Sequence, residues 1–203
     1  MSDLRINNSK QSSGLFTENN THYFISGLEG PVLIFIHGVG LCSEIWEPQV
    51  EYFSKQYKVI TYDFLGHGLT PPASKSPTIE DYVEQLNELV ISLGISSFSL
   101  IGHSMGAIIS VAYSLKYGDK INSLIPLNIV YKRSNGARNQ VLDRANKIIQ
   151  TGEIGSIEQT MSRWFENKKN PDQIVKINKV RQLLLNASPK GYGHAYKDRK
   201  RHV

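Results

Sequence analysis

The chain has 203 residues and a mass of 22.8 kDa, which suits one domain or one domain with a modest insertion. Apolar residues make up 40% and charged residues 20% of it, which excludes a collagen-like, low-complexity or wholly disordered chain. No apolar run approaches the roughly 18 residues of a membrane span, and residues 1–20 lack the apolar centre of a signal peptide. We therefore expect a cytoplasmic protein with no membrane partner. A single cysteine, Cys42, excludes an intramolecular disulfide and a four-cysteine zinc site.

Positive charge is concentrated in the last third of the chain. Residues 1–130 contain 7 Lys and Arg against 12 Asp and Glu, whereas residues 131–203 contain 16 against 6. Such asymmetry is typical either of a solvated helical surface or of a site for an acidic partner. No zinc-finger, RNP-type or GxxG pattern accompanies the basic residues, so we expect no nucleic-acid partner.

Short apolar segments alternate with helical patterns along the first 130 residues, which predicts an α/β fold with a mostly parallel sheet flanked by helices. The predicted strands are residues 21–26, 31–36, 58–63, 97–101 and 121–130. In the last of them, Pro126 is expected only at an irregularity, because proline cannot donate to a sheet ladder.

The predicted helices lie between and after these strands. The clearest covers residues 79–93, with Thr78 and Asp81 as a capping pair and Gly94 after its end. Others are predicted over residues 44–55 and from Met105 onward. Residues 136–187 are predicted to form helices broken near Gly152, Gly155 and Pro171, without a strand.

The strongest chemical motif is Gly102-His-Ser-Met-Gly106, which matches G-x-S-x-G directly after a predicted strand. On a sharp strand-to-helix turn, the two glycines give room for close packing, and the Ser104 hydroxyl is lifted out of the sheet. The following helix N-terminus favours developing negative charge there. The alternative is an ordinary strand-to-helix turn. We predict a nucleophilic Ser104 with a strained, positive φ.

Two further glycine loops follow predicted strands. His37-Gly-Val-Gly40 is expected to supply one oxyanion donor, the Val39 N–H, beside the N–H of Met105. Alone, this sequence would be interpreted as a plain glycine turn. The loop that begins at Asp63 contains glycines at 66 and 68, and Asp63 is expected to bind loop amides rather than act as a catalytic acid.

With these motifs in order, residues 20–196 resemble the α/β-hydrolases of the esterase, lactonase and haloperoxidase-like group. Arg144, Gly152, Arg163-Trp164-Phe165 and Gly191-Tyr192 are similar to the helical cap of 3-oxoadipate enol-lactonase and its relatives. The resemblance implies that Ser104 is the nucleophile, that a small-molecule ester or lactone is the substrate, and that no metal or organic cofactor is used. It divides the chain into a core (1–130), a cap (131–196) and a basic tail (197–203).

The acid and the histidine of a catalytic triad are not found at matching positions. In this fold the chain order is Ser, Asp or Glu, then His, placed after strands that follow the cap. Beyond Ser104 the histidines are His194, in a segment that resembles the end of the cap, and His202. Asn128 stands where some relatives carry an acid. We expect a chain that lacks its final strands and has impaired activity, the alternative being a non-catalytic fragment or ligand-binding protein.

His103 and His37 also lie within the motifs. By strand alternation, His103 is expected to point away from the nucleophile, and His37 is expected to order the oxyanion loop. Basic cap residues are expected to give the entrance of the site a positive potential that steers anionic substrates; they are Lys132, Arg133, Arg138, Arg144, Lys147 and Arg163. The sequence leaves the acyl group and the oligomeric state open.

Overall fold

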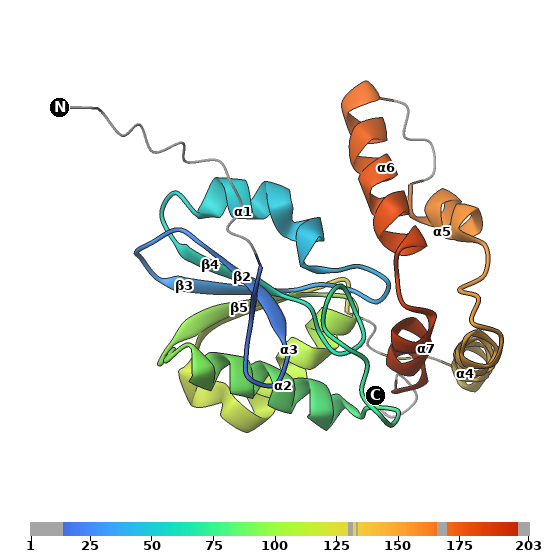
Figure 1. Ribbon diagram of the computed structural model, residues 1–203, viewed down its shortest axis with the longest axis horizontal. Helices are drawn as coiled ribbons and strands as arrows, with labels where there is room; N and C mark the ends of the chain where they lie inside the picture. Colours follow the sequence, from blue (N-terminus) through green and yellow to red (C-terminus); the bar gives the residue numbers. More distant parts are fainter. Residues whose placement is uncertain (1–13, 130–131, 133, 166–169, 199–203) are drawn as a thin grey trace.

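The computed structural model describes residues 14–129, 132, 134–165 and 170–198. Within these ranges six strands form one sheet in the order β1-β2-β4-β3-β5-β6 (Figure 1). Their bounds are β1 Leu15–Phe16, β2 His22–Ser26, β3 Val32–Ile36, β4 Lys58–Tyr62, β5 Phe98–His103 and β6 Ile121–Leu127. The five predicted strands are confirmed, and the two-residue β1 is additional.

Parallel pairing dominates the sheet. β3 pairs with β4 and with β5, and β5 with β6, all in parallel, whereas β1 and β2 add an antiparallel margin. Because the parallel strands point the same way, the loops after β3, β4 and β5 emerge at one edge of the sheet. That edge carries all three glycine motifs.

Helices cover both faces of the sheet. A 3₁₀ turn (Ser43–Trp46) and α1 (Glu47–Phe53) lie over one face, where Phe35, Trp46 and Ile101 form a small apolar cluster (Figure 1). Helices α2 (Ile79–Ser92) and α3 (Met105–Tyr117) cover the other face with the larger core. Burial on both sides explains why β3 is apolar at every position.

The predicted limits of α2 are confirmed. Thr78 and Asp81 form a capping box, in which the Thr78 N–H donates to Asp81 Oδ2 at 2.6 Å, and Gly94 follows the end with φ +62°.

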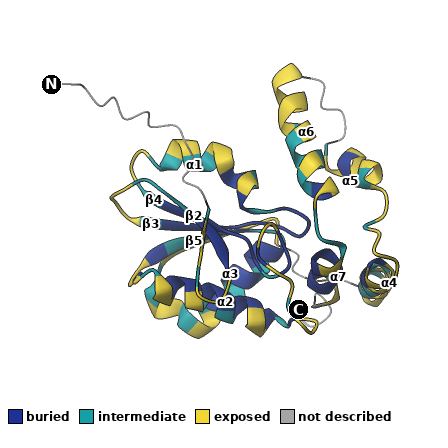
Figure 2. Cartoon of the chain, in the orientation of Figure 1, coloured by how far each residue is buried: buried dark blue, intermediate teal, exposed yellow. Residues whose placement is uncertain are grey.

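Strand β6 lies at one margin of the sheet, where it pairs with β5, and most of its residues are exposed. Figure 2 shows the inner strands β3 and β4 as mostly buried. Pro126 lies inside this strand, paired with Gly102, while the register shift of the pair falls at Phe98/Ser99. The expectation that Pro126 needs an irregularity is therefore wrong. The Leu127 carbonyl accepts from the Ser104 N–H, so by alternation the Pro126 nitrogen faces the open edge, where no ladder bond is lost.

Four helices, called the cap below, lie beside the edge that carries the glycine loops (Figure 1). They are α4 Asn135–Thr151, α5 Ile157–Trp164, α6 Pro171–Leu185 and α7 Pro189–Asp198. The predicted breaks at Gly152, Gly155 and Pro171 separate α4, α5 and α6, as expected. None of the helices in the described ranges is long and apolar enough to cross a bilayer.

Helix α7 anchors the cap to the core. A Cβ built on Gly191 would lie 1.8 Å from the Gly66 carbonyl oxygen, and one built on Gly40 would lie 2.5 Å from the ring of Tyr192. Tyr192 is buried. The cap thus contacts both the loop after β3 and the loop after β4 through backbone and ring contacts that leave no space between them.

Candidate active site

Ser104 lies at the junction of β5 and α3 with φ +56° and ψ −108°. This is the strained backbone predicted from the motif. A Cβ on Gly102 would lie 2.2 Å from the Gly106 carbonyl oxygen, and one on Gly106 would lie 2.3 Å from the Ile36 carbonyl oxygen. Only glycine fits at either position, because backbone atoms occupy the space of any side chain. The geometry is that of a nucleophile elbow.

The loop after β3 lies directly beside Ser104. A Cβ built on Gly38 would lie 3.4 Å from Cβ of Ser104, and Val39 lines the same cavity as the serine. The Met105 N–H is the first of α3 and so has no acceptor within the helix. In the described part of the chain, the Val39 N–H donates to no backbone acceptor. The loop that carries Val39 and the first amide of α3 therefore both lie beside Ser104.

His37 orders this loop, as expected. Its ring is fully buried and stacks on Phe64 with ring centroids 4.0 Å apart. Nε2 accepts the Phe64 N–H at 3.2 Å, so Nδ1 carries the proton and donates to the Gly38 carbonyl at 2.8 Å. Burial lowers the pKa of His37 from 6.5 to about 4, although Asp63 opposes the shift. The imidazole is consequently neutral near pH 7.

Asp63 binds loop amides, as expected from its motif. Its carboxylate accepts from the N–H groups of Ser43 at 2.7 Å and Leu69 at 3.0 Å, and lies 2.6 Å from Nδ1 of His22. Burial raises the pKa of Asp63, but the His22 hydrogen bond, His37 and the two amides outweigh it and hold that pKa below its usual value. With its oxygens engaged in this way, Asp63 ties the loops after β3 and β4 together.

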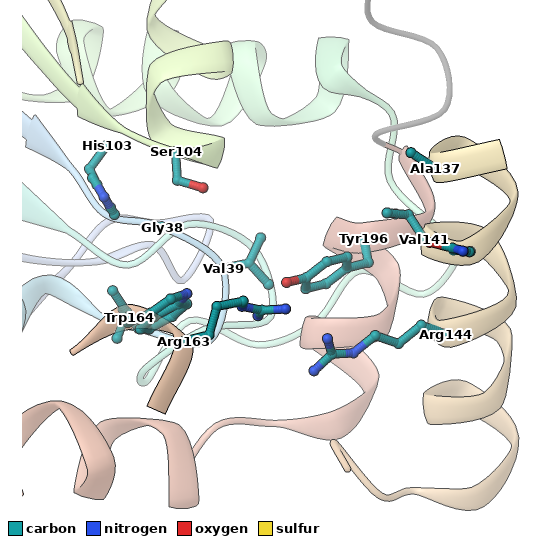
Figure 3. A pocket seen from close by; sticks show the side chains of 12 residues that line it. Gly38, Val39, His103, Ser104, Ala137, Val141, Arg144, Arg163, Trp164 and Tyr196 are labelled. Carbon is teal, nitrogen blue, oxygen red and sulfur yellow. The ribbon is translucent and has the colours of Figure 1, made fainter. Parts of the chain in front are cut away.

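A cavity of about 400 Å³ lies in front of Ser104, between the core and the cap. Figure 3 shows the Ser104 hydroxyl and Val39 facing it from the core, with Arg144, Arg163 and Tyr196 reaching it from the cap. Apolar, aromatic and cationic groups thus surround the Ser104 hydroxyl.

His103 and Ser104 are adjacent but turn in different directions. The Ser104 hydroxyl points away from the His103 ring (Figure 3). Strand alternation does not separate the two residues, because the chain leaves the strand conformation at Ser104 and both line the same cavity. The His103 Nε2 lies 3.3 Å from Nδ2 of Asn128, which has φ +51° just after β6.

His194 is not among the residues that line this cavity. It is a buried residue of α7, and in the described part of the chain no hydrogen-bond partner of its Nδ1 is present. Burial, with Lys190 and Lys197 nearby, lowers the pKa of His194. His202 lies outside the described residues, so its predicted position stays open.

The basic cap residues are divided by the structure. Arg144 and Arg163 line the cavity, Lys132, Arg138 and Lys147 do not, and Arg133 lies outside the described residues. Sequence reasoning missed other lining residues, namely Leu41, Ala137, Gln140, Val141 and Tyr196. Their signal is weak, because a helix presents several faces and only the packing of the cap decides which face meets the serine.

Comparison with known proteins agrees with this geometry. The (E)-2-((N-methylformamido)methylene)succinate hydrolase of Acinetobacter baylyi is 38% identical over 185 residues, which cover 90% of this chain and 68% of that protein. The enol-lactonase of Burkholderia xenovorans is 24% identical with a TM-score of 0.81, covering 90% of this chain and 70% of that structure. A malate-bound esterase of Thermogutta terrifontis is also 24% identical, with a TM-score of 0.80 and coverage of 94% and 73%.

The family assignment rests on the core and most of the cap together. The model of the alpha/beta hydrolase fold matches residues 31–187, from the start of β3 to the end of the α6 region. This span includes the oxyanion loop, the Asp63 loop and the elbow. The chain belongs to the alpha/beta hydrolase fold family.

Proposed function

We propose that this chain is a serine hydrolase that cleaves a small carboxylic ester or lactone bearing an acidic group. The observation that carries the proposal is Ser104 on its strained turn, with its hydroxyl facing a cavity of about 400 Å³ beside the Val39 and Met105 amides. A serine held in this way, at a helix N-terminus and next to free N–H groups, is built for acyl transfer.

The reaction runs in two halves. The Ser104 oxygen attacks the carbonyl carbon, its proton passes to a base, and the two amides donate to the oxyanion that forms. The carbon–oxygen bond then breaks, and the leaving alkoxide takes up the proton. Water attacks the acyl-serine by the same route, which releases the acid and restores the serine hydroxyl.

The base in this family is an imidazole. In the described part of the chain, the histidine that lines the cavity is His103, and its ring is turned away from the hydroxyl in Figure 3. His37 is held neutral with both nitrogens engaged, and His194 lies outside the lining. We assign none of these three to proton transfer, so Ser104 and the two amides are the catalytic groups of the proposal.

The acidic character of the substrate is supported by the cap. Arg144 and Arg163 bring two positive charges to the cavity that holds Ser104. The hydrolase of Acinetobacter baylyi with 38% identity is named for a substituted succinate, a dicarboxylate. A guanidinium pairs well with a carboxylate, because its planar donors match the two oxygens.

The nucleophile is tested with a fluorophosphonate probe and with 4-nitrophenyl esters on the purified chain. We expect the probe to add its mass to Ser104 and Ser104→Ala to remove that labelling. Because no base is assigned among the described residues, we expect ester turnover to lie about 10³-fold or more below that of a relative with a complete triad, and Ser104→Ala to abolish the part of it that depends on the serine. Ser114→Ala is the matched control, because Ser114 lies on α3 with its hydroxyl bonded to the Val111 carbonyl. It should label and turn over like the unaltered chain.

The outcomes separate the two candidate activities. Turnover that persists in Ser104→Ala would contradict the proposed nucleophile. Absence of labelling and turnover, with small carboxylic acids still bound in the cavity, would favour the ligand-binding alternative instead.

A further inference from the structure

A second cavity, of about 390 Å³, lies beside the first and is formed entirely by the cap. It is bounded by the end of α4, the connection to α5, and α5 itself. Arg144 and Arg163 line both cavities, so the two spaces share a cationic wall. Neither the family motifs nor the proposed chemistry at Ser104 uses this second space.

Its charge is strongly unbalanced. Lys147 joins the two arginines in the lining, while Glu153 is the carboxylate that faces the same space. Within the described ranges, none of the three cations forms an ion pair; the cap's ion pairs are instead those of Lys179 with Glu47 and Arg181 with Glu158. Three cations against one carboxylate leave an excess of positive charge, which attracts an anion into the space between them.

The groups around the cations are suited to an anionic oxygen. Arg144 is held over the ring of Tyr196, with its guanidinium carbon 5.6 Å from the ring centroid, which fixes its side chain at the shared wall. The polar side chain of Gln159 also lines the second cavity, while the Thr160 hydroxyl donates to the Ser156 carbonyl at 3.4 Å. An amide donor beside cations is an ordinary partner of a carboxylate or phosphate.

We infer that the second cavity is a subsite for a remote carboxylate or phosphate of the same substrate whose acyl group lies against Ser104. The shared wall of Arg144 and Arg163 is the reason to join the two spaces, since a single elongated molecule can pass between them. Lys147 then recognises the far end. This inference rests on the proposed function for the identity of the near end.

Binding measurements on Ser104→Ala test the subsite without any turnover. The probes are the dicarboxylates succinate, glutarate, adipate and suberate, with the monocarboxylate hexanoate as reference and inorganic phosphate and 6-phosphohexanoate as the phosphate arm, each titrated by calorimetry. We expect the longer diacids to bind more tightly than hexanoate, and the Lys147→Gln change to weaken them about fivefold, as for one partly exposed charge pair. Hexanoate should be unaffected by that change.

Lys176→Gln is the matched control, because Lys176 is an exposed cap lysine of α6 outside both cavities. It should leave all the affinities unchanged. If Lys147→Gln and Lys176→Gln weaken diacid binding equally, the effect is due to the net charge of the chain, and the subsite is overturned. A further outcome would also overturn the subsite. If the affinity for phosphate depends on Lys147 while the affinity for the diacids does not depend on their length, the second cavity is a separate anion site. Loss of ester turnover alone would contradict only the proposed function.

Discussion

The two walls of the active-site cavity are built in different ways. On the core side, Ser104 and Val39 are placed by backbone packing so close that a Cβ on Gly106 would lie 2.3 Å from a carbonyl oxygen. On the cap side, Arg163 and Trp164 reach the cavity as exposed side chains, and a Cβ on Gly152 or Gly155 would meet nothing within 4 Å. The core wall is set by backbone packing, whereas the α5 part of the cap wall is set by exposed side chains.

This difference separates chemistry from selectivity. Ser104 and the amides of Val39 and Met105 cannot shift without disturbing β3, β5 and α3 together, so under the proposed function the reaction type is fixed by the core. The cap residues that line the cavity can be exchanged without touching those elements. Substrate preference can therefore change while the chemistry stays the same.

The largest expected effect is that of Gly106→Ala in the core. The new methyl group would press on the Ile36 and His37 carbonyl oxygens, which belong to the central part of the sheet and its following loop. We expect the free energy of unfolding to fall by about 4 kcal/mol, and ester turnover to be lost with it. Urea denaturation followed by tryptophan fluorescence measures the first quantity. An unchanged midpoint would show that the core wall is less rigid than its packing indicates.

A second effect depends on pH and on His37. Because burial lowers its folded pKa from 6.5 to about 4, the unfolded chain binds the proton more readily between these values. The resulting stability is complete above pH 6.5 and is lost as the pH falls toward 4, by about 3 kcal/mol in all. Urea titrations across this range should show the slope, and His37→Gln should flatten it.

His194 provides the cap's counterpart to that measurement. The pKa of His194 is also lowered, chiefly by burial. Its contribution to the free energy of unfolding is therefore also present above its ordinary pKa and lost as the pH falls. We expect His194→Gln to flatten the slope less than His37→Gln does. A larger change from His194→Gln would reverse the comparison between the two regions.

The smallest expected effect is Gly136→Ala in the cap. Gly136 lies in the first turn of α4, and its Cβ would meet nothing within 4 Å. Alanine should raise the stability of the chain by about 0.5–1 kcal/mol, because glycine loses more backbone entropy in a helix. Thermal unfolding of the variant beside the unaltered chain measures it. A decrease would mean that the start of α4 is more tightly packed than the structure shows.

The core was predictable from sequence for the same reason that it is rigid. Positions where only glycine fits produce sequence motifs that can be recognised. Strands that are covered on both faces produce continuous apolar runs, which predict them clearly. Ser104, Val39, Met105, His37 and Asp63 all lie where these patterns placed them relative to the sheet. The pairing of β1 with β2 escaped prediction, because two residues carry no periodicity.

The cap was less predictable, since its helices carry no motif that fixes their mutual packing. That Arg144 and Arg163 face Ser104 while Arg138 does not depends on how α4 and α5 rest on the core. Helical periodicity alone leaves that rotation open. The prediction for Pro126 failed for a related reason. A proline is tolerated in β6 because its nitrogen faces the open edge of the sheet, and the sequence of one strand does not show its place in the strand order.

The contact between Gly66 and Gly191 has an evolutionary consequence. Neither position has space for a Cβ, and each is blocked by the other's backbone. A side chain gained at one of them cannot be compensated by shrinking the other, which is already the smallest residue. Relatives in which α7 packs on the loop after β4 in this way must keep both glycines. A relative that loses either one must move α7 away from that loop, and this also moves the Tyr196 side of the cavity. Aligned descendants would thus show the two positions conserved or abandoned as a pair.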